Sequence, residues 1–251
     1  MVTGGSGYIG MNLIRHLQKQ DCTYINYDLR LGHDLLDERG LYQQMKGCDV
    51  VVHLAALPGV SYCEKNIDEA IEINLLGTCN VVRAANTHEI SVILMSSFAA
   101  KTDNVYGLTK RLAEKVTLQS SLNVVLRAAN VYGGIGYLQK KRSAIASFVK
   151  HKKAGVMATI YGDGTDERDF VHVDDVCNAV ILAFGAPSGI YEICTRRYTS
   201  IQELADMVGV EYEFTSSREV DVHKVAHDAV EEALGWKPTI KLEDGLKELL
   251  K

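Results

Sequence analysis

Short apolar runs alternate with longer amphipathic stretches along the first half of the chain. The runs at residues 23–28, 49–56, 91–96 and 123–129 are almost continuously apolar and rich in Val and Ile. This composition is typical of strands that are buried on both faces of a parallel sheet. Residues 11–20, 68–87 and 106–120, which lie between the runs, carry apolar positions at helical spacing. The alternation predicts an α/β fold with a doubly wound parallel sheet of the Rossmann type.

After about residue 133 the alternation becomes irregular. The pattern there predicts helices over residues 143–153 and 174–185 and short strands at 158–162 and 189–194. Ser200 and Glu203 have the spacing of a capping box, so a helix is expected from residue 201. The tail, residues 227–251, carries two more short helical patterns. We expect residues 1–133, helped by 158–182, to form a Rossmann domain. Residues 134–251 are expected to form mainly a smaller C-terminal α/β lobe.

Composition excludes several classes of function. The 251 residues are 47% hydrophobic and carry a net charge of −5, which argues against a nucleic-acid partner. No apolar run reaches the roughly 18 residues that a membrane span needs, and we read no secretory signal. The six cysteines are scattered, with none in a C-x-x-C pair, so we interpret them as reduced thiols of a cytoplasmic protein.

Four glycines cluster where a predicted strand ends and a helix begins. Gly4 and Gly5 allow backbone angles that other residues avoid, and Gly10 lets the helix pack closely on the sheet. Gly7 lets a pyrophosphate approach the helix N-terminus. Asp28 ends the next strand, near the spacing expected of a carboxylate that binds the ribose hydroxyls of NAD and repels the 2′-phosphate of NADP. The alternative is a structural glycine turn with a solvent-facing Asp28.

A second pattern combines a serine, a tyrosine and a lysine. Tyr106 and Lys110 are four residues apart and therefore share a helix face. An ammonium near a phenol favours the phenolate, which makes the tyrosine a usable base. Ser97 ends the preceding strand, at the sheet edge where ligands bind. Taken singly, these residues are equally consistent with a solvated helix face and a turn cap.

Together the motifs resemble a known family. TGGSGYIG, HLAA, INLLGT, MSS, YGLTK, LRAANVYG, YGDGTDERDFVHVDDV and LGWKP follow one another between Thr3 and about Leu249. In them the chain resembles the extended short-chain dehydrogenases/reductases, the NAD-dependent sugar-nucleotide epimerases and dehydratases. Among these it is most similar to the UDP-glucose 4-epimerases.

The resemblance implies roles for individual residues. Tyr106 is the acid/base, Ser97 bonds the reacting hydroxyl, and Lys110 holds the nicotinamide ribose and lowers the pKa of the tyrosine. The residues implied in cofactor binding are Gly4, Gly7, Tyr8, Ile9, Gly10, Asp28, Asp34, Leu35, Leu54, Ala55, Ala56 and Asn74, together with Tyr106 and Lys110. The residues implied in substrate binding are Asn130, Arg168, Arg218 and Asp221. The resemblance thus implies that residues 1–133, helped by 158–182, bind NAD and that residues 134–251 are mainly the substrate lobe for a nucleotide sugar.

Guanidinium groups suit the diphosphate of a nucleotide sugar. Arg168, however, lies among Asp166, Glu167 and Asp169, so a surface ion cluster is the alternative for it. His172 is not accompanied by a second histidine at ligand spacing, and we assign no metal.

The residues after Ser97 indicate which reaction of the family to expect. The 4,6-dehydratases of the family carry Asp-Glu or Asp-Lys there, whereas this chain has Phe98 and Ala99. The resemblance therefore favours epimerisation at C4 of a UDP-linked sugar, of the glucose/galactose type or its N-acetyl analogue, through a transient 4-keto sugar. One alternative is a 4,6-dehydratase or 4-ketoreductase in which Lys101 or Asp103 supplies the acid/base. A second is a non-catalytic NAD-binding sensor.

The resemblance also implies a homodimer. Family members commonly pair through two helices each in a four-helix bundle, and the matching helices here are roughly 66–87 and 105–120. Two departures from the family are a short segment between Ser97 and Tyr106 and Glu192 at a position where relatives commonly have asparagine. The apolar positions available for pairing are Leu75, Leu76, Val81, Val82, Leu112 and Val116.

Overall fold

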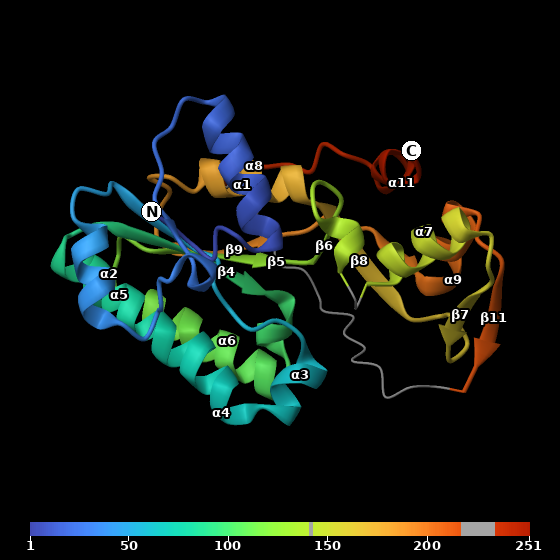
Figure 1. The fold of residues 1–251 in the computed structure, drawn as a ribbon, viewed down its shortest axis with the longest axis horizontal. Coiled ribbons are helices and arrows are strands. Elements are labelled where there is room, and N and C mark those ends of the chain that lie inside the picture. The colour runs from blue at the N-terminus through green and yellow to red at the C-terminus, as the bar shows by residue number, and fades with distance from the viewer. Residues whose placement is uncertain (141–142, 217–233) are drawn as a thin grey trace. The chain divides into compact units, whose positions relative to one another are not determined.

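A computed structural model describes residues 1–140, 143–216 and 234–251 (Figure 1). The chain divides into two compact units. Among the described residues, the first unit comprises Met1–Ala128, Cys177–Ile193 and 234–236. The second comprises Ala129–Val176 and the described parts of 194–216 and 237–251. Of the segment 158–182, residues 158–176 therefore belong to the second unit and only 177–182 to the first.

The first unit is built on a six-stranded parallel sheet with the strand order β2-β1-β3-β4-β5-β9. This order confirms the predicted doubly wound sheet, because the chain steps outward in both directions from the middle. The four predicted apolar runs supply β2 to β5, and 189–194 supplies β9. The strands are β1 (Val2–Thr3), β2 (Asn26–Tyr27), β3 (Val50–His53), β4 (Ser91–Ser97), β5 (Val124–Ala128) and β9 (Gly189–Ile193).

Helices cover both faces of this sheet. In Figure 1, α2, α5 and α6 lie on one face, and α1 and α8 lie on the other. The helix predicted over 68–87 is present, but residues Ile71–Leu76 form a π-helical stretch within it. Two helices were not predicted, α2 and α3. The bounds are α1 (Tyr8–Lys19), α2 (Glu38–Met45), α3 (Val60–Lys65), α4 (Ile67–Ala70), α5 (Gly77–Thr87), α6 (Val105–Thr117) and α8 (Val173–Leu182), with short 3₁₀ turns at Leu29–Leu31 and Phe98–Lys101.

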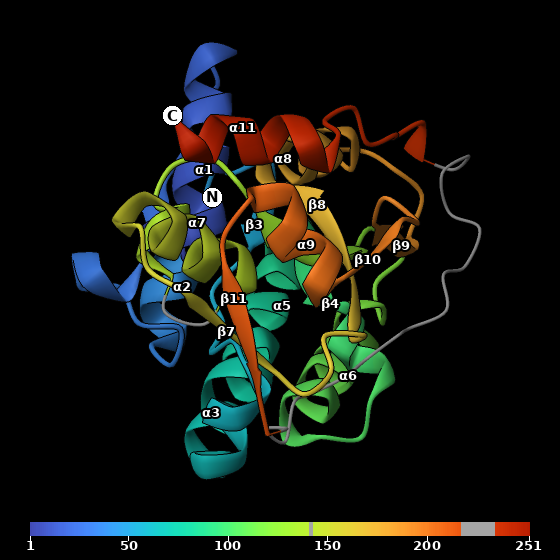
Figure 2. The same ribbon diagram turned by 90° about the vertical axis from the view of Figure 1, so that its right-hand side faces the viewer.

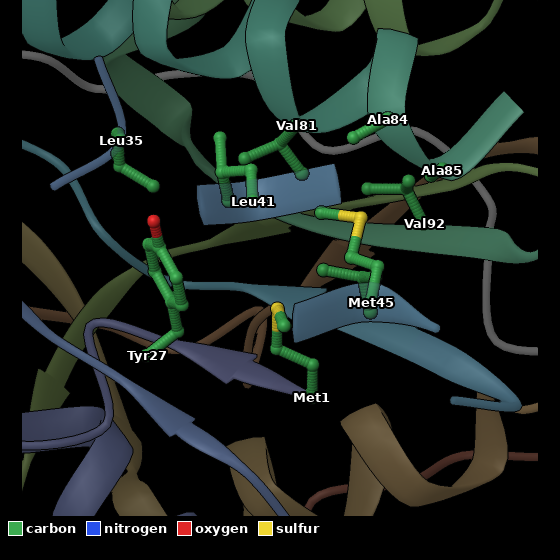
Figure 3. Packing of buried hydrophobic residues seen from close by; sticks show 10 residues of the cluster. Met1, Tyr27, Leu35, Leu41, Met45, Val81, Ala84, Ala85 and Val92 are labelled. Atoms are coloured by element: carbon green, nitrogen blue, oxygen red, sulfur yellow. The ribbon is translucent and has the colours of Figure 1, made fainter. Parts of the chain in front are cut away.

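The core on the α2/α5 side explains why these segments fold as they do. Leu41 and Met45 are one turn apart on α2 and are fully buried against α5 and the sheet. Figure 3 shows them packed with Val81 of α5 above Met1 and Tyr27 of β2. The remaining members of the cluster are Leu35, Val51, Ala84, Ala85 and Val92.

The second unit contains two small sheets. One has the order β10-β8-β6 and the other pairs β11 with β7 (Figure 2). The predicted start of the helix at residue 201 is confirmed, because Ser200 is its N-cap and the Glu203 backbone N–H donates to Ser200 Oγ over 3.0 Å at the start of α9. The bounds are β6 (Asn130–Tyr132), β7 (Ala158–Tyr161), β8 (Glu167–His172), β10 (Tyr198–Ser200), β11 (Tyr212–Thr215), α7 (Ala144–Ala154), α9 (Ile201–Val208) and α11 (Leu242–Leu250), with a 3₁₀ turn at Tyr137–Gln139.

Candidate functional site

The glycine turn joins β1 to α1, and its glycines serve different purposes. Gly4 has a φ of +69°, and a Cβ there would lie 2.7 Å from the backbone nitrogen of Ala55. A Cβ at Gly10 would lie 2.5 Å from the Cα of Gly5. These positions need glycine because backbone segments meet there. A Cβ at Gly7, by contrast, would meet one atom of the described residues, the Gly4 carbonyl oxygen at 3.1 Å.

Gly7 is also the N-cap of α1, a twelve-residue helix with no acidic residue in its first turn. The N–H groups and the positive dipole end of α1 therefore lie behind a backbone surface without side-chain bulk. Tyr8 and Ile9, which begin the helix, are half-buried. This geometry suits a pyrophosphate.

Asp28 is buried at the end of β2, not solvent-facing. Its Oδ2 accepts from the Ser6 backbone N–H and its Oδ1 from that of Arg30, each over 2.9 Å. Arg30 Nη1 in turn donates to the Ser6 carbonyl over 2.8 Å. The carboxylate is thus fixed beside the glycine turn, and each oxygen keeps a lone pair for a ribose hydroxyl. The turn and the carboxylate together fit NAD.

The residues expected near adenine differ in exposure. Asp34 is exposed, and its carbonyl oxygen accepts from the Tyr27 hydroxyl over 2.9 Å. Leu35 belongs instead to the buried core, where a Cβ on Gly77 would come within 3.1 Å of it. The Leu35 side chain therefore packs the protein interior.

A polar network orders the segment that follows β3. Thr3 Oγ1 lies 2.7 Å from His53 Nδ1, and His53 Nε2 lies 3.0 Å from Thr78 Oγ1. Thr78 Oγ1 donates to the carbonyl of Asn74, and Thr3 Oγ1 accepts from the Ala55 N–H. Leu54 and Ala56 flank Ala55 in this segment and are half-buried.

Asn74 completes this arrangement from the π-helical stretch. Its Oδ1 accepts from the Leu57 N–H over 2.7 Å, and its Nδ2 donates to the Leu57 carbonyl and to Thr109 Oγ1. Asn74 is buried and holds the 54–57 backbone rather than presenting its amide to solvent. π-Helical turns recur at functional sites because they change the direction of a side chain.

Ser97, Tyr106 and Lys110 come together at the end of β4. Tyr106 shares a side-chain hydrogen bond with Ser97, and Ser97 also caps the 3₁₀ turn that follows it. Lys110 is buried one helical turn further along α6 and donates from Nζ to the Met95 carbonyl over 2.7 Å. The structure thus places the three predicted catalytic residues in one group.

The electrostatics of this group differ from the expectation. Burial raises the pKa of Tyr106 to about 12, and the hydrogen bond from Ser97 only partly opposes that rise. Burial lowers the pKa of Lys110 to about 8, against the favourable charge of Glu114. In the protein alone the pKa of Tyr106 is thus raised and not lowered as expected, because desolvation is the largest influence on it.

The residues proposed for a dehydratase reaction are engaged elsewhere. Lys101 forms an ion pair with Glu192 of β9, and the Glu192 side chain is 2% exposed. Asp103 is exposed and pairs with Arg111 over 3.0 Å. Phe98 lies under the Lys101 ammonium, 5.6 Å from its ring centre. Glu192, which departs from the family pattern, therefore has a counter-ion in this chain.

The expected substrate residues lie in the second unit. Asn130 is exposed and donates to the Asp169 carbonyl over 3.1 Å. Arg168, mostly buried, donates to the Glu167 carbonyl and lies 3.9 Å from Asp166. Arg218 and Asp221 lie outside the described residues.

No group of three metal-ligating side chains occurs among the residues that the structure describes. Near the residues considered for a metal, Asp175 is buried. Its carboxylate accepts hydrogen bonds from the Thr239 N–H and hydroxyl and from the Ile240 N–H. Asp175 thus holds residues 239 and 240 in place.

Sequence reasoning missed several residues of the site. His53, Glu114 and Arg127 are polar residues within apolar runs or on an inward helix face. Glu114 lies eight residues after Tyr106 and four after Lys110, and this spacing was the one signal that could have found it.

Comparisons with known proteins agree with this geometry. The sequence profile of the NAD dependent epimerase/dehydratase family matches residues 1–194. A UDP-glucose 4-epimerase of Mycolicibacterium smegmatis is 27% identical, over 98% of this chain and 95% of its own. A GDP-6-deoxy-D-mannose reductase of Pseudomonas aeruginosa is also 27% identical, over 99% and 95%.

Among solved structures, the UDP-glucose 4-epimerase of Thermotoga maritima with UDP-glucose superimposes with a TM-score of 0.91 at 25% identity. The match covers 99% of this chain and 96% of that one. In the described residues, no helix has the length and apolar character needed to cross a membrane.

Proposed function

Because the chain belongs to the NAD-dependent epimerase/dehydratase family, we propose that it inverts C4 of a UDP-linked sugar through a transient 4-keto sugar. The sugar is of the glucose/galactose type or its N-acetyl analogue. Relatives that share nearly the whole chain include a UDP-glucose 4-epimerase.

The observation that carries this proposal is the group formed by Ser97, Tyr106 and Lys110. It can move one proton to and from a hydroxyl, which is all that an inversion by oxidation and reduction asks of the protein. Elimination of water from C5 and C6 needs further acid and base groups. Phe98 and Ala99 cannot supply them, and Lys101 and Asp103 are engaged in ion pairs.

The residues that would hold NAD are Gly4, Gly7, Gly10 and Asp28, with the 54–57 backbone and Asn74 beside them. Bound NAD supplies a hydride acceptor and the positive charge of the oxidised nicotinamide. The Asp28 carboxylate repels a 2′-phosphate, so we expect preference for NAD over NADP.

The protein's own groups handle the proton. Ser97 orients the 4-hydroxyl by a hydrogen bond, and the Tyr106 oxygen takes its proton when the keto sugar forms and returns it afterwards. With a pKa of about 12, Tyr106 is protonated in the protein alone. A cation close to the phenol is therefore required before it acts as a base near neutral pH, since a nearby positive charge lowers the pKa of an acid.

The test is interconversion of UDP-glucose and UDP-galactose, and of the N-acetyl pair, by Tyr106→Phe. Removing the acid/base should lower kcat by about 10²- to 10⁴-fold. Tyr42→Phe is the matched control, because Tyr42 is exposed and stacks on His88. Undiminished turnover by Tyr106→Phe contradicts the assignment. Net consumption of NAD(P)H, or a 4-keto-6-deoxy product, identifies the reductase or dehydratase instead, and NAD that stays oxidised with every sugar identifies a sensor.

We propose the second unit as the substrate lobe. Arg168 and Asn130 are offered as ligands of the diphosphate, together with Arg218 and Asp221. A guanidinium suits this role because its planar donors match phosphate oxygens in pairs.

We further propose a homodimer through a four-helix bundle. Val81 and Val82 are buried within the protomer and are not available for pairing. Leu76 and Leu112 are 43% and 46% exposed, while Leu75 and Val116 are half-buried. Exposed apolar side chains on neighbouring helices indicate a surface that a partner covers. The others on these helices are Ile67, Ile71 and Leu108.

A cytoplasmic location is proposed on the cysteines. None of the six is paired in a disulfide, and three of them are buried. Buried thiols are typical of proteins in a reducing compartment.

A further inference from the structure

Side chains of α6 contact the end of β4 at regular intervals. Three consecutive residues at the end of β4 are each bound by a side chain of α6. Tyr106 bonds Ser97, Lys110 Nζ donates to the Met95 carbonyl over 2.7 Å, and Ser96 Oγ donates to Glu114 Oε1 over 2.5 Å. Tyr106, Lys110 and Glu114 succeed one another at four-residue intervals, so they line one face of the helix.

Glu114 also accepts hydrogen bonds from a side chain of β5. Arg127 donates from Nε to Glu114 Oε1 over 2.8 Å and from Nη2 to Oε2 over 2.6 Å. Arg127 is the register partner of Ser96 on the neighbouring strand. The Glu114 side chain is 3% exposed and that of Arg127 is 15% exposed. A forked, buried pair of this kind fixes both distance and orientation.

We propose that Glu114 and Arg127 are positioning residues for the proton transfer, setting the register of α6 on β4 so that Tyr106 meets Ser97. This inference rests on the proposed function. If α6 slid or rotated, the Tyr106 oxygen would move relative to Ser97 at the other end of the same helix face. Misplacement of a reacting group by about 1 Å can reduce a rate about 10²-fold.

The pair also acts on the charge of Lys110. Among the described residues, the titratable groups that interact with this ammonium are Glu114 on α6 and His53 on β3, and Glu114 is paired in turn with Arg127 of β5. His53 is neutral, because burial lowers its pKa to about 3. Glu114 therefore supplies the negative charge that keeps Lys110 protonated up to about pH 8.

The experiment compares Glu114→Gln with the wild type in kcat, KM and the pH dependence of kcat, with UDP-glucose as the probe. We expect kcat to fall about 10- to 100-fold with KM changed less than about threefold. The alkaline limb of the profile should move to lower pH, because the neutral amide no longer favours the Lys110 ammonium. Arg127→Lys keeps the charge without the fork and should lose less activity than Arg127→Met.

Glu38→Gln is the matched control. Glu38 pairs with Arg83 over 3.0 Å, but both side chains are at least 60% exposed, so kcat and its pH profile should be unchanged. If Glu114→Gln fails to fold, the comparison of Arg127→Lys with Arg127→Met decides. A kcat within twofold of the wild type and an unmoved alkaline limb overturn the proposal.

A second readout separates this proposal from the proposed reaction. Crystal structures of the variants should show Tyr106 displaced from Ser97, and ¹⁵N spectra should show a lowered Lys110 pKa in Glu114→Gln. Both are measured without turnover. If the wild type converts no UDP-sugar, the proposed function fails while these measurements still decide whether the pair positions α6.

Discussion

At the scale of single residues, the donors and acceptors around His53 determine its tautomer. Thr78 Oγ1 gives its hydrogen to the Asn74 carbonyl, so it must accept at the same oxygen from His53 Nε2–H. Nδ1 is then the acceptor for the Thr3 hydroxyl. A proton added to Nδ1 would break that hydrogen bond and charge a fully enclosed ring. The pKa of His53, which burial lowers to about 3, reflects this cost.

This arrangement predicts acid sensitivity. Between pH 6.5 and about 3 the unfolded chain binds a proton at His53 that the folded protein does not. The free energy of unfolding should therefore fall as pH falls, by about 1.4 kcal/mol per pH unit from this group. His53→Asn removes the titrating imidazole. The free energy of unfolding, measured with urea from pH 6 to 4, should then depend on pH less steeply, by the amount that one bound proton contributes. Thr78→Val, the control, should lower stability by about 1 kcal/mol at every pH and keep the slope.

The predictability of the site also follows at this scale. Tyr106 and Lys110 were predictable because helical spacing within one segment brings them together, and Ser97 because strand ends meet at one sheet edge. The pairing of Glu114 with Arg127 was not predictable, since it depends on which strand neighbours β4, although spacing alone puts Glu114 on the same helix face as Lys110. The direction of the Tyr106 pKa shift was missed because burial cannot be read from spacing.

At the scale of elements, the short connection between β4 and α6 depends on one ion pair. Lys101 is 21% exposed in its side chain, whereas Glu192 of β9 is 2% exposed. Loss of the lysine removes a counter-ion of a buried carboxylate, while loss of the carboxylate affects an ammonium that reaches water. Removing Lys101 should therefore lower the free energy of unfolding more than removing the Glu192 charge.

We expect Lys101→Met to lower the free energy of unfolding by about 3–5 kcal/mol and the isosteric Glu192→Gln by roughly half of that. The double variant should recover most of the loss, because neither charge then remains unpaired. Urea unfolding of the four proteins measures the coupling. Equal and additive losses would show that the pair does not hold this segment.

Elements were predictable where a period was long enough to read. The strands β3, β4 and β5 lie in apolar runs and α1, α5 and α6 have clear helical periods, whereas β6 and β10 have three residues each and show neither signal. β8 begins with three charged residues, Glu167, Arg168 and Asp169, so its sequence does not look like that of a buried strand. The π-helical stretch was unpredictable because it keeps the apolar period while turning Asn74 toward Leu57.

At the scale of the whole molecule, α4, the π-helical stretch and α6 carry a set of exposed apolar side chains. Ile67 and Ile71 are one turn apart, as are Leu108 and Leu112, and all four are exposed. α6 packs beside both α4 and the π-helical stretch, and Figure 1 shows α4 and α6 on one side of the sheet. The proposed bundle requires that a partner cover both apolar rows.

Leu112→Glu should dissociate the dimer, because pairing would place two carboxylates in an apolar interface. Leu112 is 46% exposed in the protomer, so its replacement leaves the fold intact. We expect the dissociation constant to rise about 100-fold or more, equivalent to ~3 kcal/mol. Leu122→Glu is the matched control, since Leu122 is 52% exposed in the turn before β5, away from both rows. Sedimentation velocity at micromolar concentration should give a dimer for the wild type and the control and a monomer for Leu112→Glu. A monomeric wild type, or a Leu112→Glu dimer, would mean that this surface is not the interface.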